Sequence, residues 1–179
     1  MTSPDPVAEA AAYQQYLLAA LAADDPALAQ ASTPARIRRL IDAAGDDVRA
    51  RPEPGEWSVL ECIGHVTDAE VVMAARYRWI IAHDEPDLIG YDQDLWVNRL
   101  HHGQDDIEEL VGLFEGLRAA NLALWGRTTA AERARVGLHR ERGPESLDLL
   151  FHLIGGHDRI HLDQADRALA AVRRMSGNA

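Results

Sequence analysis

Two histidines four residues apart, His157 and His161, are the residues of this sequence best suited to bind a metal ion. On a helix, side chains at positions i and i+4 lie on one face, with about 5–6 Å between their Cβ atoms. Both imidazoles can therefore reach one metal ion, since neutral imidazole is a common ligand of zinc and its neighbours. Two ligands do not complete a site, so a third must come from elsewhere in the chain.

His65 is the strongest candidate for the third ligand among the eight histidines, because it lies on the apolar face of a predicted helix. His152 precedes His157 by five residues and points away from it around the same helix. Three further histidines fall at predicted helix ends or in loops, where solvent-exposed histidines are usual: His101, His102 and His139.

A metal site and a structural role are both open for these histidines. A single histidine on an apolar helix face is more often a hydrogen-bonded core residue than a ligand. Three protein ligands, in contrast, would leave a coordination position for water or substrate. Zinc, nickel, iron(II) and manganese all remain candidates, because ligand type alone does not separate them.

The histidine pair also resembles the HExxH motif of zinc proteases, with Asp158 in place of the glutamate. Aspartate is one methylene shorter than the glutamate base of that motif. Residues 162–179 contain no histidine or glutamate that could act as a downstream ligand. The protease interpretation is therefore rejected.

Composition favours one globular domain over residues 1–179, with 47% apolar residues. The formal net charge of −11 argues against nucleic-acid binding, which requires clustered positive charge. All 18 basic residues are arginine, so no lysine can form a Schiff base. The single cysteine, Cys62, excludes an intrachain disulfide, and neither a signal peptide nor a membrane-spanning run is evident. We expect a cytoplasmic protein that binds neither nucleic acid nor membrane.

Capping residues and prolines divide the chain into helices. The predicted helices cover residues 5–23, 34–48, 59–83, 92–100, 105–125 and 147–173. Asp25–Pro26 should open a short helical turn, and Thr33–Pro34 should start the second long helix, since proline is favoured at the first helical position. Ser58–Glu61 and Thr129–Glu132 match the capping box, and Ser146 should cap the last helix.

Loops are predicted at residues 84–91 and, as a polar segment, at 136–144. No segment alternates between apolar and polar residues over a useful length, so no strand is predicted. The expected fold is all-α: a four-helix bundle with an extra N-terminal helix and short connections.

Two stretches of this sequence together resemble the DinB/YfiT-like superfamily, and specifically its DinB-like domain. The first is Glu56–His65 (EWSVLECIGH) and the second is His157–Gln164 (HDRIHLDQ). The resemblance covers about residues 33–171, and residues 1–32 lie outside it as an N-terminal extension. It implies a bundle of up-down-down-up topology, often a homodimer, with a divalent metal, most often zinc or nickel, held by His65, His157 and His161.

The resemblance implies a function of one of three kinds. Characterised relatives include transferases and isomerases in which the metal activates a low-molecular-weight thiol, bacillithiol or mycothiol, for attack on a small electrophile. Other relatives are described as metal-dependent hydrolases, in which metal-bound hydroxide would attack the substrate. The third alternative is a stress-associated binding or structural protein without enzymatic activity. We expect the thiol transferase, acting on a small molecule.

Three residues near the histidines are candidates for supporting roles. Asp158 could accept a hydrogen bond from an imidazole N–H, and the alternative that it has no such role is equally open. Gln164 could orient His161, although a solvent-facing glutamine is the simpler interpretation. Arg76 could bind a carboxylate of the thiol, although a structural salt bridge with Asp92 or Asp94 is the simpler interpretation.

Other residues near the histidines favour packing roles, and the sequence contains no convincing general base. Cys62 and Trp57 are expected to pack in the core. The loops at residues 84–94 and 139–143 are expected to select the substrate, although they carry no recognisable motif.

Overall fold

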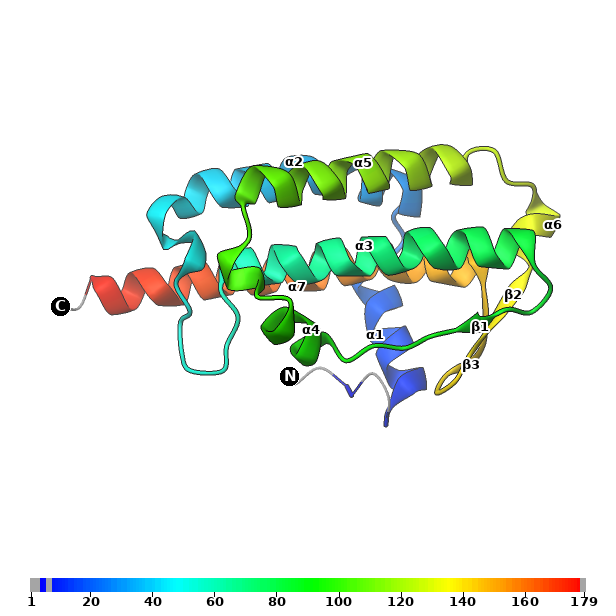
Figure 1. Cartoon of the computed structure of the whole chain (residues 1–179), viewed down its shortest axis with the longest axis horizontal. Helices are drawn as coiled ribbons and strands as arrows, with labels where there is room; N and C mark the ends of the chain where they lie inside the picture. Colours follow the sequence, from blue (N-terminus) through cyan, green and yellow to red (C-terminus); the bar gives the residue numbers. More distant parts are fainter. Residues whose placement is uncertain (1–3, 6–7, 178–179) are drawn as a thin grey trace.

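Four long helices form the body of the computed structural model, which describes residues 4–5 and 8–177. They are α2 (Pro26–Ala44), α3 (Val59–Ala82), α5 (Ile107–Trp125) and α7 (Leu147–Ser176). In Figure 1, α2 and α7 run in one direction, whereas α3 and α5 run in the other. The predicted all-α bundle and its up-down-down-up topology are therefore confirmed. Within the described part of the chain, no helix is long and apolar enough to cross a membrane.

The predicted caps set where the metal-ligand candidates lie along their helices. Ser58 accepts a hydrogen bond from the backbone N–H of Glu61 (3.2 Å), and the Glu61 carboxylate accepts one from the backbone N–H of Ser58 (2.9 Å). Ser146 accepts in the same way from Leu149 (3.0 Å). These caps fix the starts of α3 and α7, and so the phase of the helix faces that carry the histidines.

The second helix begins eight residues earlier than predicted, because Pro34 lies inside α2 and not at its start. Asp25 caps this helix by accepting from the backbone N–H of Leu28 (2.9 Å). Pro34 has no N–H to donate to the carbonyl of Gln30, four residues before it. That carbonyl instead accepts from Arg118 on α5 (3.3 Å), which explains how the helix continues through the proline.

The predicted polar loop at residues 136–144 is wrong, because most of this segment forms a β-hairpin. β2 (Val136–His139) pairs antiparallel with β3 (Gly143–Ser146), and β1 (Asp87–Leu88) pairs parallel with β2. Gly143 has a φ of +77°, the left-handed conformation that closes a three-residue hairpin loop. Strands of two to four residues are too short to show alternation in the sequence.

A long connection links α3 to α5 because these helices run parallel. It contains β1, then α4 (Gln93–Arg99) and a short 3-10 helix (His102–Gln104). Figure 1 shows this connection returning along the outside of the bundle. The predicted short helix at 92–100 agrees with α4, whereas the predicted loop at 84–91 contains a strand.

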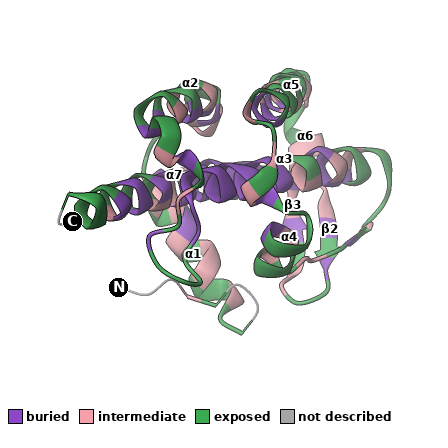
Figure 2. Ribbon diagram, turned by 60° about the vertical axis from the view of Figure 1, so that its left-hand side comes forward, coloured by how far each residue is buried: buried purple, intermediate pink, exposed green. Residues whose placement is uncertain are grey.

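The N-terminal helix α1 (Ala10–Leu21) is shorter than predicted and packs closely against α7. A Cβ atom at Gly156 would lie only 1.9 Å from the carbonyl oxygen of Leu17, so the contact requires glycine there. In Figure 2, buried residues run along the centre of α3 and α7, while α2 and α5 expose their outer faces. The histidine candidates therefore lie on the two most enclosed helices.

The remaining elements are short. A 3-10 helix (Gly45–Arg49) follows α2, and α6 (Ala130–Arg133) precedes the hairpin. The predicted capping box at α6 is present, with Thr129 accepting from the backbone N–H of Glu132 (3.2 Å).

Candidate metal centre and adjoining pocket

The structure brings His65, His157 and His161 together from two helices. One ring nitrogen from each of these buried residues lies within 4.8 Å of the other two. The Nε2 atoms of His65 and His157 are 3.0 Å apart. Three nitrogen ligands of a tetrahedral zinc ion lie about 3.3 Å apart, given Zn–N bonds of about 2.05 Å. The spacing therefore fits a single metal ion.

The protonation state of the cluster also suits a metal. Burial, and then the charges of the neighbouring imidazoles, hold the pKa values of His65 and His157 well below the ordinary value. Burial lowers the pKa of His161 to about 4. All three rings are therefore neutral at pH 7, the form in which imidazole binds metal. The Nδ1 atoms of His65 and His157 are buried and have no hydrogen-bond partner among the described residues.

Gln164 and Trp57 contact the cluster from outside it. The Oε1 atom of the half-buried Gln164 lies 3.0 Å from Nδ1 of His161, so the solvent-facing interpretation is wrong. A hydrogen bond from Nδ1–H leaves the lone pair on Nε2, the tautomer needed for a ligand. The ring of Trp57 lies 5.0 Å from that of His65 and 6.0 Å from that of His161, between centroids.

Asp158 binds a buried arginine and not an imidazole. Its Oδ2 accepts hydrogen bonds from Arg118 Nη1 (2.6 Å) and Thr33 Oγ1 (2.8 Å). Arg118 also donates to the carboxylate of Glu70 (2.8 Å). The interpretation of Asp158 as an acceptor for a histidine ring is therefore wrong. Arg118 was not among the predicted site residues, although its position in phase with Val111, Phe114 and Asn121 on α5 places it on the inner face.

Two of the histidines expected at the surface are buried. His102 Nε2 lies 2.7 Å from Asp68, and its Nδ1 lies 2.6 Å from Asp105. Burial alone would lower the pKa of His102, but the hydrogen bonds to both carboxylates outweigh burial and raise it. A Cβ atom at Gly64 would lie 2.5 Å from the His102 ring, which explains the glycine beside His65.

His139 is the second buried exception, whereas His101 is exposed as predicted. The Nδ1 atom of His139 lies 3.0 Å from the carboxylate of Glu141. Burial, followed by the charge of Arg142, lowers the pKa of His139 to about 4, so this ring is neutral at pH 7.

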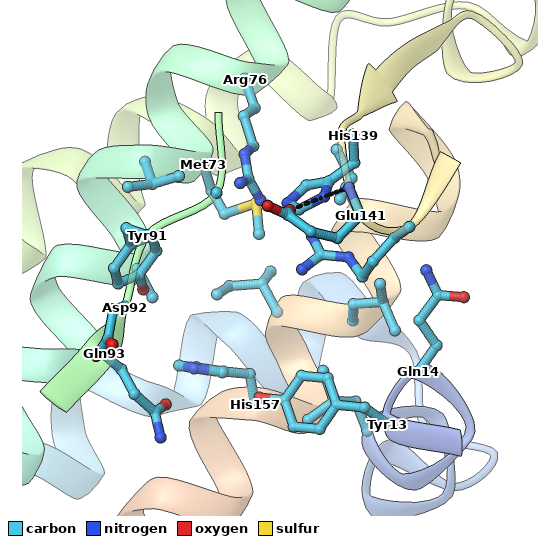
Figure 3. Close-up of a pocket in the computed structure, with 18 of the residues that line it drawn as sticks. Tyr13, Gln14, Met73, Arg76, Tyr91, Asp92, Gln93, His139, Glu141 and His157 are labelled. Carbon is cyan, nitrogen blue, oxygen red and sulfur yellow. Dashed lines mark hydrogen bonds and ion pairs between the residues drawn. The ribbon is translucent and has the colours of Figure 1, made fainter. Parts of the chain in front are cut away.

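A cavity of about 540 Å³ adjoins the cluster, and His65 and His157 form part of its wall. The size suits a small-molecule ligand. Figure 3 shows His157 at one end, and Arg76, His139 and Glu141 at the other. Both loops expected to select the substrate contribute to the wall: Gly90, Tyr91, Asp92, Gln93 and Asp94 from one, and His139, Glu141 and Arg142 from the other.

Helix α1, for which the sequence indicated no role, supplies another part of the wall. Tyr13, Gln14 and Leu17 face the cavity from this helix. Tyr91 also lines the cavity, and its ring lies 6.4 Å from that of His65 and 4.4 Å from that of Trp96. Burial raises the pKa of Tyr91, so the phenol stays protonated at pH 7.

Arg76 does not form the predicted salt bridge with Asp92 or Asp94. Its Nη2 donates to the backbone carbonyl of Ile89 (2.6 Å), and its Nε is buried without a hydrogen-bond partner among residues 4–5 and 8–177. Asp92 instead caps α4 by accepting from the backbone N–H of Leu95 (2.9 Å).

Comparison with known proteins identifies the family. Residues 29–165 match the model of the DinB superfamily. A putative metal-dependent hydrolase from Geobacillus kaustophilus is 25% identical over 151 residues, covering 80% of each chain. The structure of YfiT from Bacillus subtilis, a probable metal-dependent hydrolase with an unusual four-helix bundle topology, matches with a TM-score of 0.72 and 17% identity, covering 98% of this chain and 93% of that one. The family match and the three-histidine cluster together support a metal-binding protein, and the chain belongs to the DinB superfamily.

Proposed function

We propose that this protein is a metal-dependent transferase in which a low-molecular-weight thiol attacks a small electrophile. His65, His157 and His161 would hold the metal, zinc or nickel. A divalent metal bound there supplies positive charge that lowers the pKa of a thiol or of water in the cavity. Gln164 keeps Nε2 of His161 unprotonated by accepting from Nδ1, and Trp57 packs beside the rings of His65 and His161.

One observation carries the choice of a thiol: no carboxylate of the described residues joins the histidine cluster. Asp158, the residue next to His157, is held by Arg118 and Thr33. Attack by water in metalloproteases uses a carboxylate as general base, whereas a thiolate is a nucleophile without further assistance. In the proposed step, the sulfur forms a bond to the electrophilic carbon, the leaving group departs with its bonding electrons, and the thiol proton passes to solvent.

A metal-dependent hydrolase is the second candidate. It is favoured by the descriptions of the relatives from Geobacillus kaustophilus and Bacillus subtilis, both of which name a metal-dependent hydrolase. Water would then replace the thiol as the nucleophile in the same cavity.

The two candidates are separated by assaying one protein with two substrates. Zinc-loaded and nickel-loaded proteins are incubated with monochlorobimane plus bacillithiol, mycothiol or cysteine, and separately with p-nitrophenyl acetate without thiol. His161→Ala removes a ligand. His152→Ala is the matched control, because His152 lies on the same helix outside the cluster and its Nδ1 contacts the carbonyl of Asp148 (2.8 Å).

We expect fluorescent conjugate to form faster than in the uncatalysed reaction with at least one thiol, in the parent protein and in His152→Ala. The rate should fall to background in His161→Ala. Thiol-independent ester hydrolysis that is kept in His152→Ala and lost in His161→Ala would overturn the transferase and support the hydrolase. Metal bound in stoichiometric amount with neither activity would leave a structural metal site and overturn both.

A further inference from the structure

Arg76 is a buried cation on the wall of the cavity, and the described residues provide it with no ion pair. The residue is 3% exposed. Among the described residues, its side chain makes one hydrogen bond, from Nη2 to the carbonyl of Ile89, and its Nε has no partner. A buried charge without a paired counter-charge is costly, so such groups usually have a partner.

The carboxylates nearest in the wall have other partners. Glu145 is fully buried, and it accepts hydrogen bonds from Arg142 (2.6 and 3.1 Å) and from Gln14 (2.8 Å). The Glu141 carboxylate lies 3.0 Å from Nδ1 of His139, and it forms no ion pair with Arg76 among the described residues. The guanidinium of Arg76 is therefore available to a ligand in the cavity.

We propose that Arg76 binds the carboxylate of a small-molecule substrate that reaches from this end of the cavity to the histidine cluster. The proposal rests on the proposed function only in placing the reacting end of the substrate at the metal. A guanidinium edge matches the planar geometry of a carboxylate. A doubly charged phosphate is disfavoured, because the exposed carboxylates of Asp92, Asp94 and Glu141 also border the cavity.

The wall between the two ends indicates the rest of the ligand. Arg76 follows His65 by eleven residues on α3, a rise of about 16 Å, and its side chain can lean back toward the helix start. The ligand would therefore span on the order of 10 Å. Apolar side chains line this interval: Ala69, Val72, Met73, Leu150, Leu153 and Ile154. The substrate class is thus a monocarboxylate with an apolar body.

The test compares octanoate with its uncharged isostere octanamide, and with octyl phosphate, by isothermal titration calorimetry. Each probe is titrated into zinc-loaded and metal-free protein at pH 7. The variants are Arg76→Met, Arg76→Lys and His161→Ala. Arg39→Met, which removes an exposed arginine on α2, is the matched control.

We expect the parent protein and Arg39→Met to bind octanoate about 10- to 100-fold more tightly than octanamide, as for hydrogen bonds to a charged group. Arg76→Met should remove this preference without weakening octanamide binding, and Arg76→Lys should keep part of it. Metal-free protein and His161→Ala should keep the preference.

Three outcomes would overturn the inference: a preference for octanoate that survives in Arg76→Met, equal binding of octanoate and octanamide by the parent protein, or tighter binding of octyl phosphate than of octanoate. Failure of the metal site is recognised separately. If the purified protein takes up no zinc or nickel but keeps the Arg76-dependent preference, the proposed function fails and the carboxylate site stands.

Discussion

Arg118 on α5 and Arg76 on α3 are both buried arginines, and they differ in what surrounds them. Arg118, 1% exposed, contacts two buried carboxylates, Glu70 at 2.8 Å and Asp158 at 2.6 Å. Arg76, 3% exposed, contacts a backbone carbonyl and faces a cavity. Burial alone therefore does not distinguish an arginine with a structural role from one that is available to a ligand.

The charged neighbours of each arginine distinguish the two roles. Burial would lower the pKa of Arg118, but its two carboxylates outweigh burial and raise it. For Arg76, burial and the neighbouring charge of Arg142 lower the pKa by more than the Glu145 carboxylate raises it. The described residues therefore stabilise the charge of Arg118, whereas they compensate the charge of Arg76 only in part.

The largest expected effect is that of Arg118→Met. This variant leaves Glu70 and Asp158 buried without their cation, so we expect a loss of about 3–5 kcal/mol in the free energy of unfolding. Urea denaturation of the metal-free protein at pH 7 measures it. The control is Arg38→Met, which breaks the exposed pair with Glu115 (2.7 Å) and should cost less than about 1 kcal/mol. Equal losses in the two variants would contradict the structural role of Arg118.

A smaller, pH-dependent effect is expected for His102→Gln, since His102 also has two carboxylate partners. Its folded-state pKa is raised, so its charged form contributes full stability below the unfolded pKa of about 6.5. That contribution is lost as the pH rises through the folded-state pKa. We expect His102→Gln to cost about 1–3 kcal/mol at pH 6 and less at pH 8.5. Denaturant unfolding at both pH values gives the difference; a cost that grows with pH would show that His102 is neutral in the folded protein.

The smallest effect on stability is expected for Arg76→Met. Because this guanidinium forms no ion pair with a carboxylate of the described residues, its removal should change the free energy of unfolding by less than about 1 kcal/mol, or raise it. The same urea titration measures this change. A loss comparable to that of Arg118→Met would mean that the two arginines play the same role and would remove the contrast between them.

The parts of the fold that could be predicted depend on contacts local in sequence. The capping box at Ser58 and the cap at Ser146 act within one helical turn, so their residue types suffice to locate the starts of α3 and α7. The i, i+4 spacing of His157 and His161 is equally local. The start of α2 was predicted wrongly because the effect of Pro34 depends on Arg118, which lies 84 residues further along the chain. Arg118 donates to the Gln30 carbonyl in place of the N–H that Pro34 lacks.

The parts of the site that could not be predicted depend on residues brought together by folding. Gln164 is three residues from His161, so its contact could be proposed from spacing. Nothing local distinguishes Arg118, paired twice, from Arg76, paired with no carboxylate of the described residues. The same holds for His102, whose partner Asp68 lies on another helix.

The glycine contact between α1 and α7 has a consequence for how relatives of this protein could diverge. Helix α1 precedes the segment, residues 29–165, that matches the family model, yet it walls the cavity and touches α7 at Gly156 beside the histidines. Replacing this helix would reshape the binding cavity while leaving all three histidines on α3 and α7. Part of the cavity wall thus lies before the family segment, whereas the three histidines, Arg76 and both cavity loops lie within it.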